Sequence, residues 1–220
     1  MKIIGHRGAR GLAPENTIAS LKKALELGVD RIEFDVRVTI DHIPVIFHDE
    51  TLIDHSGDKL PLNRTTYQEL KNHKPGLASL QEVLDFIKGR VPLYIEVKMG
   101  SDCGPIVREL KKYQGDYWLG SKSQRTLLEL HRQLPKVPKV VIESWSGVRA
   151  RYRAKQLDTR ILSMYQRFLW SGFIVAVHRG GYELYAYTIN DPRKARRWAK
   201  CGLAGVVTDY PDRFVSRRKA

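Results

Sequence analysis

Short apolar runs rich in β-branched residues alternate along the chain with stretches whose apolar residues recur at helical spacing. The first run covers residues 2–5, and the stretch that follows, 17–27, places Leu21 and Leu25 on one helical face. Residues 31–38 alternate with a period of two, which is typical of a strand. Because strand and helix go on alternating toward the C-terminus, the pattern predicts an α/β protein with a parallel sheet.

The same rhythm predicts the remaining elements. Further strands are expected at 91–97, 116–120, 138–143, 160–165, 183–189 and 205–208, and helices at 79–87, 105–114, 123–133, 146–156, 168–177 and 192–201. Ser79, with Glu82 three residues later, has the signature of a helix capping box. Eight strands joined by crossovers favour a closed (β/α)8 TIM-type barrel, with an open doubly wound sheet as the alternative.

A single barrel domain over residues 1–220 is expected, with one small insertion. After the second strand comes a short extended piece, 45–47, and then a stretch, 49–78, that is expected to be mostly irregular with some helix near 66–71. We predict that 49–78 is the insertion. A chain of 220 residues, 42% of them hydrophobic, can bury a core of the size that such a domain needs.

The ends and the cysteines suggest a location. Residues 1–11 have no apolar run of the kind that signal peptides carry, and no stretch approaches the about 18 apolar residues of a membrane span. We therefore expect a cytoplasmic protein. Cys103 and Cys201 lie far apart in the sequence and are expected to remain free thiols.

The net charge of +14 is concentrated late in the chain, in the segments 149–155, 193–197 and 217–219. A nucleic acid, an anionic membrane surface or an acidic substrate would each suit such a field, and solvated helix faces are the structural alternative. We expect no nucleic-acid binding, because no motif of that kind is present. Peripheral contact with an anionic membrane stays open, and the oligomeric state is left undetermined.

Acidic residues occur on two strands where apolar residues would be expected. Glu33 and Asp35 are two positions apart on one strand, so they point to the same side, and Glu96 ends the next long strand. Carboxylates that face a barrel interior are costly to bury without partners. A hard divalent cation such as Mg²⁺ or Ca²⁺ would compensate them. The alternative is a cluster of ion pairs with Arg7, Arg37 and Lys98.

Two histidines stand at strand ends beside these acids. His6 and Arg7 follow the first strand, and His48 follows the extended piece after the second. Histidine suits proton transfer near neutral pH, and an arginine fork suits a phosphate. The two histidines could serve as acid and base, although a lone histidine at a strand end more often has a structural role.

Several motifs together resemble the glycerophosphodiester phosphodiesterase family. They are HRG at 6–8, PENT at 14–17, EFDV at 33–36, HD at 48–49, YIEVK at 94–98, YTIN at 187–190 and TDYPD at 208–212. Their order and spacing agree closely from residue 3 to 100, whereas residues 101–180 share only the β/α rhythm.

The resemblance implies a metal-dependent barrel enzyme that releases sn-glycerol 3-phosphate and an alcohol. It assigns one divalent cation, Mg²⁺ or Ca²⁺, to three ligands, Glu33, Asp35 and Glu96. His6 and His48 would be the general acid and base, without a choice between them. The nucleophile would be water or the 2-hydroxyl of the substrate's own glycerol.

Further residues take roles from the same resemblance. Arg7 and Lys98 would bind the phosphate. Glu15 is expected to reach the metal or to orient His6, and Asn16 to cap the following helix or to contact the ligand. Tyr187 would line the substrate pocket at a position where the family often has Trp, and the 49–78 insertion would shape the glycerol side.

Two other functions remain as alternatives. One is a related phospholipase that acts on lysophospholipid or sphingolipid head groups at a membrane surface. The other is a catalytically inactive barrel used as a binding module. An inactive barrel would be expected to lack at least one of the proposed acid–base and metal residues, and all of them are present: His6, Glu33, Asp35, His48 and Glu96.

Overall fold

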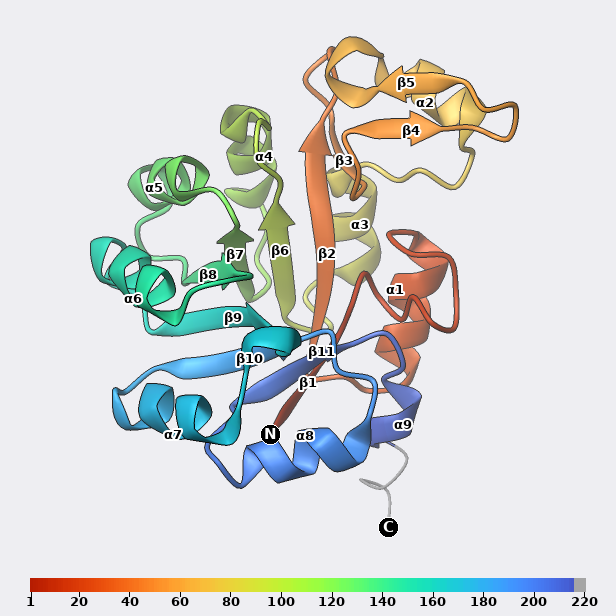
Figure 1. Ribbon diagram of the computed structural model, residues 1–220. Helices are drawn as coiled ribbons and strands as arrows, with labels where there is room; N and C mark the ends of the chain where they lie inside the picture. The colour runs from red at the N-terminus through yellow and green to blue at the C-terminus, as the bar shows by residue number, and fades with distance from the viewer. Residues whose placement is uncertain (216–220) are drawn as a thin grey trace.

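A closed ring of parallel strands forms the centre of the protein. The structure is a computed structural model, and it describes residues 1–215. The ring consists of β1 (Lys2–Gly5), β2 (Arg31–Val38), β6 (Leu93–Val97), β7 (Tyr117–Ser121), β8 (Lys139–Glu143), β9 (Ile161–Tyr165), β10 (Glu183–Tyr187) and β11 (Gly205–Thr208). Each strand pairs in parallel with the next, and β1 pairs with both β2 and β11 (Figure 1). The barrel is therefore closed, which confirms the predicted fold and excludes the open sheet.

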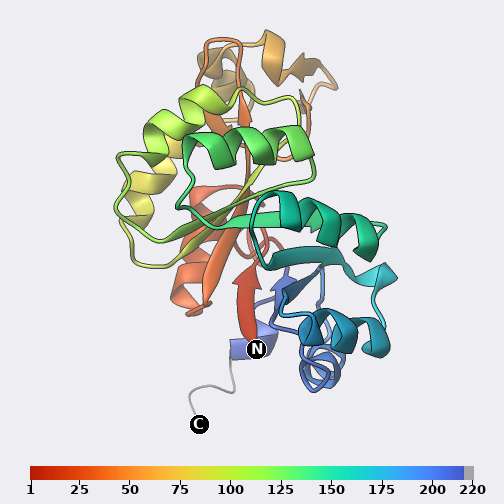
Figure 2. The same cartoon turned by 90° about the vertical axis from the view of Figure 1, so that its left-hand side faces the viewer.

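Helices cover the outside of this ring (Figures 1 and 2). They are α1 (Ile18–Glu26), α3 (Leu80–Ile87), α4 (Cys103–Leu110), α5 (Gln124–Gln133), α6 (Gly147–Gln156), α7 (Ser171–Arg179), α8 (Pro192–Ala199) and the short α9 (Asp212–Val215). The predicted capping box of α3 is present, since Ser79 and Glu82 exchange hydrogen bonds.

Two predicted helices differ from the observed ones at both ends, and the helix expected at 192–201 ends at Ala199. The helix expected at 105–114 begins at Cys103 and ends at Leu110, because the Asp102 side chain caps it by accepting from the Gly104 N–H. The helix expected at 168–177 begins only at Ser171, because residues 166–168 form a separate 3₁₀ turn. Apolar periodicity shows neither the side-chain cap at Asp102 nor the 3₁₀ turn at 166–168, so it misplaced both helix starts.

Strand β2 shows how side-chain direction divides the core from the site. Ile32, Phe34 and Val36 are fully buried among the residues that pack between barrel and helices. Burial of each such side chain contributes roughly 1.5–3 kcal/mol. Glu33 and Asp35 point the other way, into the barrel. A smaller apolar cluster fills the barrel interior itself: Ile4, Tyr94, Val140, Ile142, Tyr185 and Val207.

The region after β2 is more ordered than predicted. β3 (Pro44–Ile46) pairs antiparallel with the end of β2, and β4 (Thr51–Ile53) forms a hairpin with β5 (Lys59–Pro61). The Asp54 side chain holds the hairpin turn by accepting from the Ser56 and Asp58 N–H groups. The helix α2 (Tyr67–His73) follows, after a 3₁₀ turn, Leu62–Arg64.

This region has an apolar core of its own. Its buried members are Val45, Leu52, Leu60, Leu62, Leu70 and Leu77. The sequence prediction of mostly irregular structure was wrong here, because strands of three residues are too short to show a period of two.

Other expectations concern the surface and the chain end. Cys103 and Cys201 are both free thiols, as expected. Among the described residues, no helix has the length and the apolar content that crossing a membrane requires. The basic segment 217–219 lies outside the described residues.

Candidate active site

A cavity of about 210 Å³ opens at the end of the barrel where β1, β2 and β6 finish. The structure brings eight of the predicted site residues to its walls: His6, Arg7, Glu33, Asp35, His48, Glu96, Lys98 and Tyr187. Glu15 and Asn16 lie just behind this wall and contact residues in it. Arg10, Lys122, Ser163, Tyr165 and Thr188 also line the cavity, and sequence reasoning assigned none of them to the site.

Three carboxylates meet inside this cavity. Asp35 and Glu96 are directly paired across β2 and β6, and Glu33 lies two positions before Asp35 on the same side. One oxygen of each lies within 4.8 Å of the others. Burial, followed by the negative charges of Asp35 and Glu96, raises the pKa of Glu33 well above its ordinary value. A divalent cation would relieve this repulsion, and oxygen ligands suit Mg²⁺ or Ca²⁺, so the group could hold a metal ion.

Two basic side chains neutralise part of the same charge. Lys98 Nζ lies 2.6 Å from both Asp35 Oδ1 and Glu96 Oε1, and Arg7 Nε lies 3.2 Å from Asp35 Oδ2. Burial would raise the pKa of Asp35, but Lys98 and Arg7 hold it at about 2. Lys98 and Arg7 therefore pair with carboxylates that would also be ligands of a metal ion. The alternative of an ion-pair cluster included Arg37, but the Arg37 Nε donates to the main-chain oxygen of His48.

The loop before α1 supports Asp35 from behind. Asn16 is buried with φ of +52°, and its Nδ2 donates to Asp35 Oδ2 at 2.9 Å while its Oδ1 accepts from the Asp35 N–H. Asparagine tolerates this left-handed conformation better than most residues. The expectation that Asn16 caps the helix was wrong: Thr17 is the N-cap, and its side chain accepts from the Ser20 N–H.

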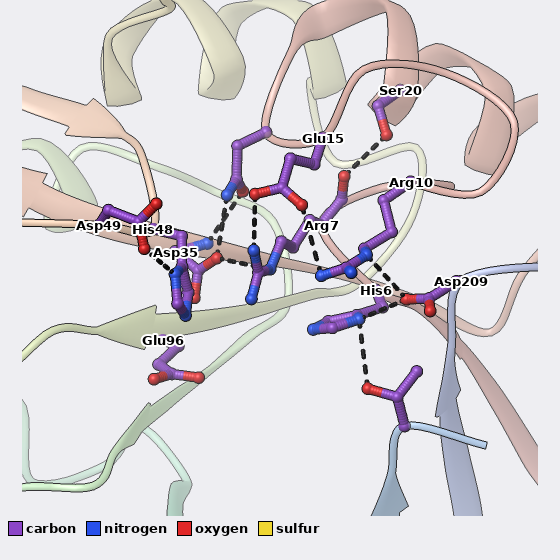
Figure 3. A network of polar contacts seen from close by, with 12 residues as sticks. His6, Arg7, Arg10, Glu15, Ser20, Asp35, His48, Asp49, Glu96 and Asp209 are labelled. Carbon is purple, nitrogen blue, oxygen red and sulfur yellow. Dashed lines mark hydrogen bonds and ion pairs between the residues drawn. The ribbon is translucent and has the colours of Figure 1, made fainter. Parts of the chain in front are cut away.

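Glu15 does not contact His6. Its carboxylate lies 2.6 Å from Arg7 Nη1 and 3.3 Å from Arg10 Nη1 (Figure 3). It is also outside the group of three carboxylates that could hold a metal. In this structure Glu15 fixes the two arginines at the cavity wall.

The residue that orients His6 comes from the other end of the chain. Asp209 Oδ1 lies 2.6 Å from His6 Nδ1, which leaves Nε2 on the side of the ring toward the cavity (Figure 3). Asp209 also accepts from Asn190 Nδ2 at 2.9 Å and pairs with Arg10 Nε at 3.2 Å. Burial opposes ionisation of Asp209, but the hydrogen bonds from His6 and Asn190 lower its pKa. The only sequence signal for Asp209 and Asn190 was their place in the motifs at 187–190 and 208–212.

His48 lies across Arg7 from His6 (Figure 3). Its Nδ1 is 2.7 Å from Asp49 Oδ1, and the carboxylate of Asp49 is largely exposed. Burial lowers the pKa of His48 below its ordinary 6.5, although Asp35 acts in the opposite direction. The ring is therefore neutral near pH 7 and can accept a proton.

Aromatic rings form the opposite wall. Tyr187 Oη is 3.0 Å from Ser144 Oγ, and burial raises the pKa of Tyr187 to about 12. The Tyr187 ring lies 5.8 Å from the Tyr165 ring and 5.9 Å from Lys122 Nζ. The Tyr187 hydroxyl thus stays protonated, and the ammonium group of Lys122 lies beside this aromatic wall.

Comparisons with known proteins point to one family along most of the chain. The model of the glycerophosphoryl diester phosphodiesterase family matches residues 6–114 and 121–213. A glycerophosphodiester phosphodiesterase of Caldanaerobacter subterraneus is 25% identical, over 97% of this chain and 96% of that protein. A glycerophosphodiester phosphodiesterase of Bacillus subtilis is 26% identical, over 98% of this chain and 86% of that protein.

A solved structure is similar over the same length. It is an Oleispira antarctica phosphodiesterase in complex with the product sn-glycerol-3-phosphate. That chain is 28% identical to this one, with a TM-score of 0.92, over 100% of this chain and 97% of that one.

Proposed function

The chain belongs to the glycerophosphoryl diester phosphodiesterase family, and we propose that it hydrolyses glycerophosphodiesters to sn-glycerol 3-phosphate and an alcohol, with one divalent cation. The observation that carries this proposal is the single cavity that three clustered carboxylates and two histidines line. The Oleispira phosphodiesterase, similar in fold and 28% identical, binds the same product.

Glu33, Asp35 and Glu96 fit the cation as ligands. Glu33 accepts a hydrogen bond from the Arg7 N–H, but burial and the charges of Asp35 and Glu96 disfavour its ionised form. A bound cation would stabilise that form. When bound, Mg²⁺ or Ca²⁺ would neutralise charge on a phosphate oxygen. Asn16 fixes the orientation of Asp35 and so acts as a positioning residue for this group.

Arg7 and Lys98 supply further positive charge for the phosphate. Both line the cavity, and Glu15 and the acidic group hold their side chains in place. Donors that are already oriented stabilise developing charge without a cost of reorganisation. Tyr187 acts on the opposite side as a wall that limits where the substrate lies.

The two histidines divide the proton transfers. His48 is neutral near pH 7 and suits the base that deprotonates the nucleophile. The bond between His6 Nδ1 and Asp209 fixes the ring with Nε2 toward the cavity, so His6 suits the acid that protonates the departing alkoxide. Water or the glycerol 2-hydroxyl is the nucleophile, and the hydroxyl has the advantage of being held beside the phosphorus.

Phosphorus NMR during turnover of glycerophosphocholine tests this function. The expected product is sn-glycerol 3-phosphate, and a transient cyclic glycerol phosphate signal would identify attack by the 2-hydroxyl. His48→Gln should lose turnover, whereas the matched control His42→Gln, on an exposed residue, should keep it. Release of phosphocholine would contradict the proposal. So would the absence of turnover with glycerophosphocholine, glycerophosphoethanolamine and glycerophosphoglycerol alike, which would favour a binding module.

A further inference from the structure

Five of the eleven large apolar side chains that are exposed among the described residues lie in the segment from Trp145 to Trp170. Trp145 is 71% exposed, Val148 82%, Tyr152 63% and Trp170 64%. Val148 and Tyr152 are four residues apart on α6 and so lie on one face of that helix, and Trp145 lies just before the N-cap, Ser146. Large apolar side chains that are exposed next to one another usually mark an interaction surface, whereas single exposed ones are ordinary.

The groups from α6 and α7 form one continuous surface. The Trp145 ring lies 5.4 Å from the Phe168 ring, and the Trp170 ring lies 5.3 Å from the Phe173 ring. Phe173 packs on Gly147, where an added Cβ would lie 2.3 Å from its ring. Figure 2 shows α6 and α7 as neighbours on the outside of the barrel. We call this surface the aromatic rim; it comprises Trp145, Val148, Tyr152, Phe168, Trp170 and Phe173.

The chain around the rim is strongly basic. Residues 143–183 contain seven Lys and Arg and three acids, and Glu143 pairs with Arg149 and the buried Arg153. The other five cations are exposed: Arg151, Lys155, Arg160, Arg167 and Arg179. A partner for this surface must therefore be both apolar and negatively charged.

The rim is also connected to the active site. Phe168 lies 6.3 Å from the Tyr165 ring, which in turn lies 5.8 Å from the Tyr187 ring. Tyr165 and Tyr187 line the catalytic cavity. A flat partner that covered the rim would therefore lie beside the mouth of that cavity.

We propose that the aromatic rim docks the protein on an anionic phospholipid membrane. Trp and Tyr rings favour the level of the lipid headgroups, and each Lys or Arg near an anionic leaflet adds to the attraction. A second copy of this chain is disfavoured, because a symmetric contact would bring two such basic segments together. A single-stranded nucleic acid is disfavoured, because the most exposed member of the rim, Val148, is aliphatic and offers no ring for base stacking.

Co-sedimentation with vesicles tests the docking and requires no turnover. A failure to bind vesicles is therefore distinguishable from a failure to hydrolyse glycerophosphodiesters. Vesicles of phosphatidylcholine with a large share of phosphatidylglycerol should bind the wild type, and pure phosphatidylcholine should bind it far less. Trp145→Ala combined with Trp170→Ala should weaken binding about tenfold, because rim rings supply the buried apolar area. Turnover of glycerophosphocholine should stay unchanged in this double variant.

Charge reversal supplies a matched pair of variants. Arg167→Glu, in the rim, should weaken binding by roughly fivefold or more, whereas Lys22→Glu, with the same change of net charge on the distant α1, should not. Absence of vesicle binding, or equal losses in both charge variants, would overturn the proposal. It would also be overturned if the two tryptophans proved necessary for binding a single-stranded oligonucleotide or for forming a dimer, with vesicle binding unaffected.

Discussion

Asp209 Oδ1 lies 2.6 Å from His6 Nδ1, although 203 residues separate them in the chain. The pair forms because β1 and β11 are neighbours in the barrel, and both residues follow directly on those strands. A carboxylate in this position fixes the orientation of the imidazole ring, so that its other nitrogen faces the reacting group.

Removal of the Asp209 charge should therefore impair proton donation by His6. We expect Asp209→Asn to lower kcat roughly 10²-fold with little change in KM, because general acid–base contributions are of that order. Steady-state kinetics measures both constants. Asp191→Asn is the matched control, since Asp191 only caps α8 and Asn is an equally good cap. Unchanged kcat in Asp209→Asn would show that the pair has no part in the chemistry.

The pH profile should reflect the environment of His48. Because burial lowers the pKa of His48, the acid limb of kcat/KM should fall below pH 6.5. The hydrogen bond to Asp49 raises this pKa, so Asp49→Asn should move the acid limb to still lower pH. Glu50→Gln serves as the control, because Glu50 pairs with Arg37 rather than with a histidine. A limb that moves upward in Asp49→Asn would contradict the role of His48 as base.

A half-buried acid outside the active site should make stability depend on pH. Burial raises the pKa of Glu109, on α4, from 4.5 to about 7, and its Oε2 is buried without a hydrogen-bond partner. The folded state thus binds this proton more tightly than the unfolded state. Its contribution to stability is greatest below pH 4.5, falls as the pH rises toward 7, and stays low above that.

Glu109→Gln removes this dependence. At pH 8 the free energy of unfolding of the variant should exceed that of the wild type by on the order of 1 kcal/mol. This is less than the full pKa shift would give, because solvent screens a side chain that is only half-buried. Near pH 4.5 the two should be nearly equal. Urea unfolding at both pH values measures the difference, with the exposed Glu26→Gln as control. An equal gain at both pH values would show that ionisation of Glu109 is not the cause.

Parts of this structure follow directly from local sequence. The eight strands were predicted because each is a short apolar run followed by a helical stretch, and the convergence of Glu33, Asp35 and Glu96 followed from a period of two on neighbouring strands. The strand pattern and the spacing of Glu33 and Asp35 depend on residues that are close in the sequence, whereas Glu96 joins them because β2 and β6 are neighbours in the barrel. The family resemblance added the expected roles of these residues.

Other parts depend on contacts that local sequence does not contain. The partnership of His6 with Asp209 requires closure of the barrel, and the turn of Asn16 toward Asp35 requires a left-handed backbone before α1. The hairpin of β4 and β5 is stabilised by the Asp54 turn rather than by strand periodicity. Each of these is a tertiary or turn effect that outweighs the local pattern.

Metal dependence of sn-glycerol 3-phosphate release from glycerophosphocholine tests the central claim most directly. The protein is treated with EDTA, and Mg²⁺ or Ca²⁺ is then returned, for the wild type and for Asp35→Asn. We predict that EDTA abolishes release, that one of the two ions restores it in the wild type, and that Asp35→Asn stays at least about 10²-fold slower. Full activity of the wild type in EDTA, or full restoration of Asp35→Asn, would contradict a cation held by Glu33, Asp35 and Glu96.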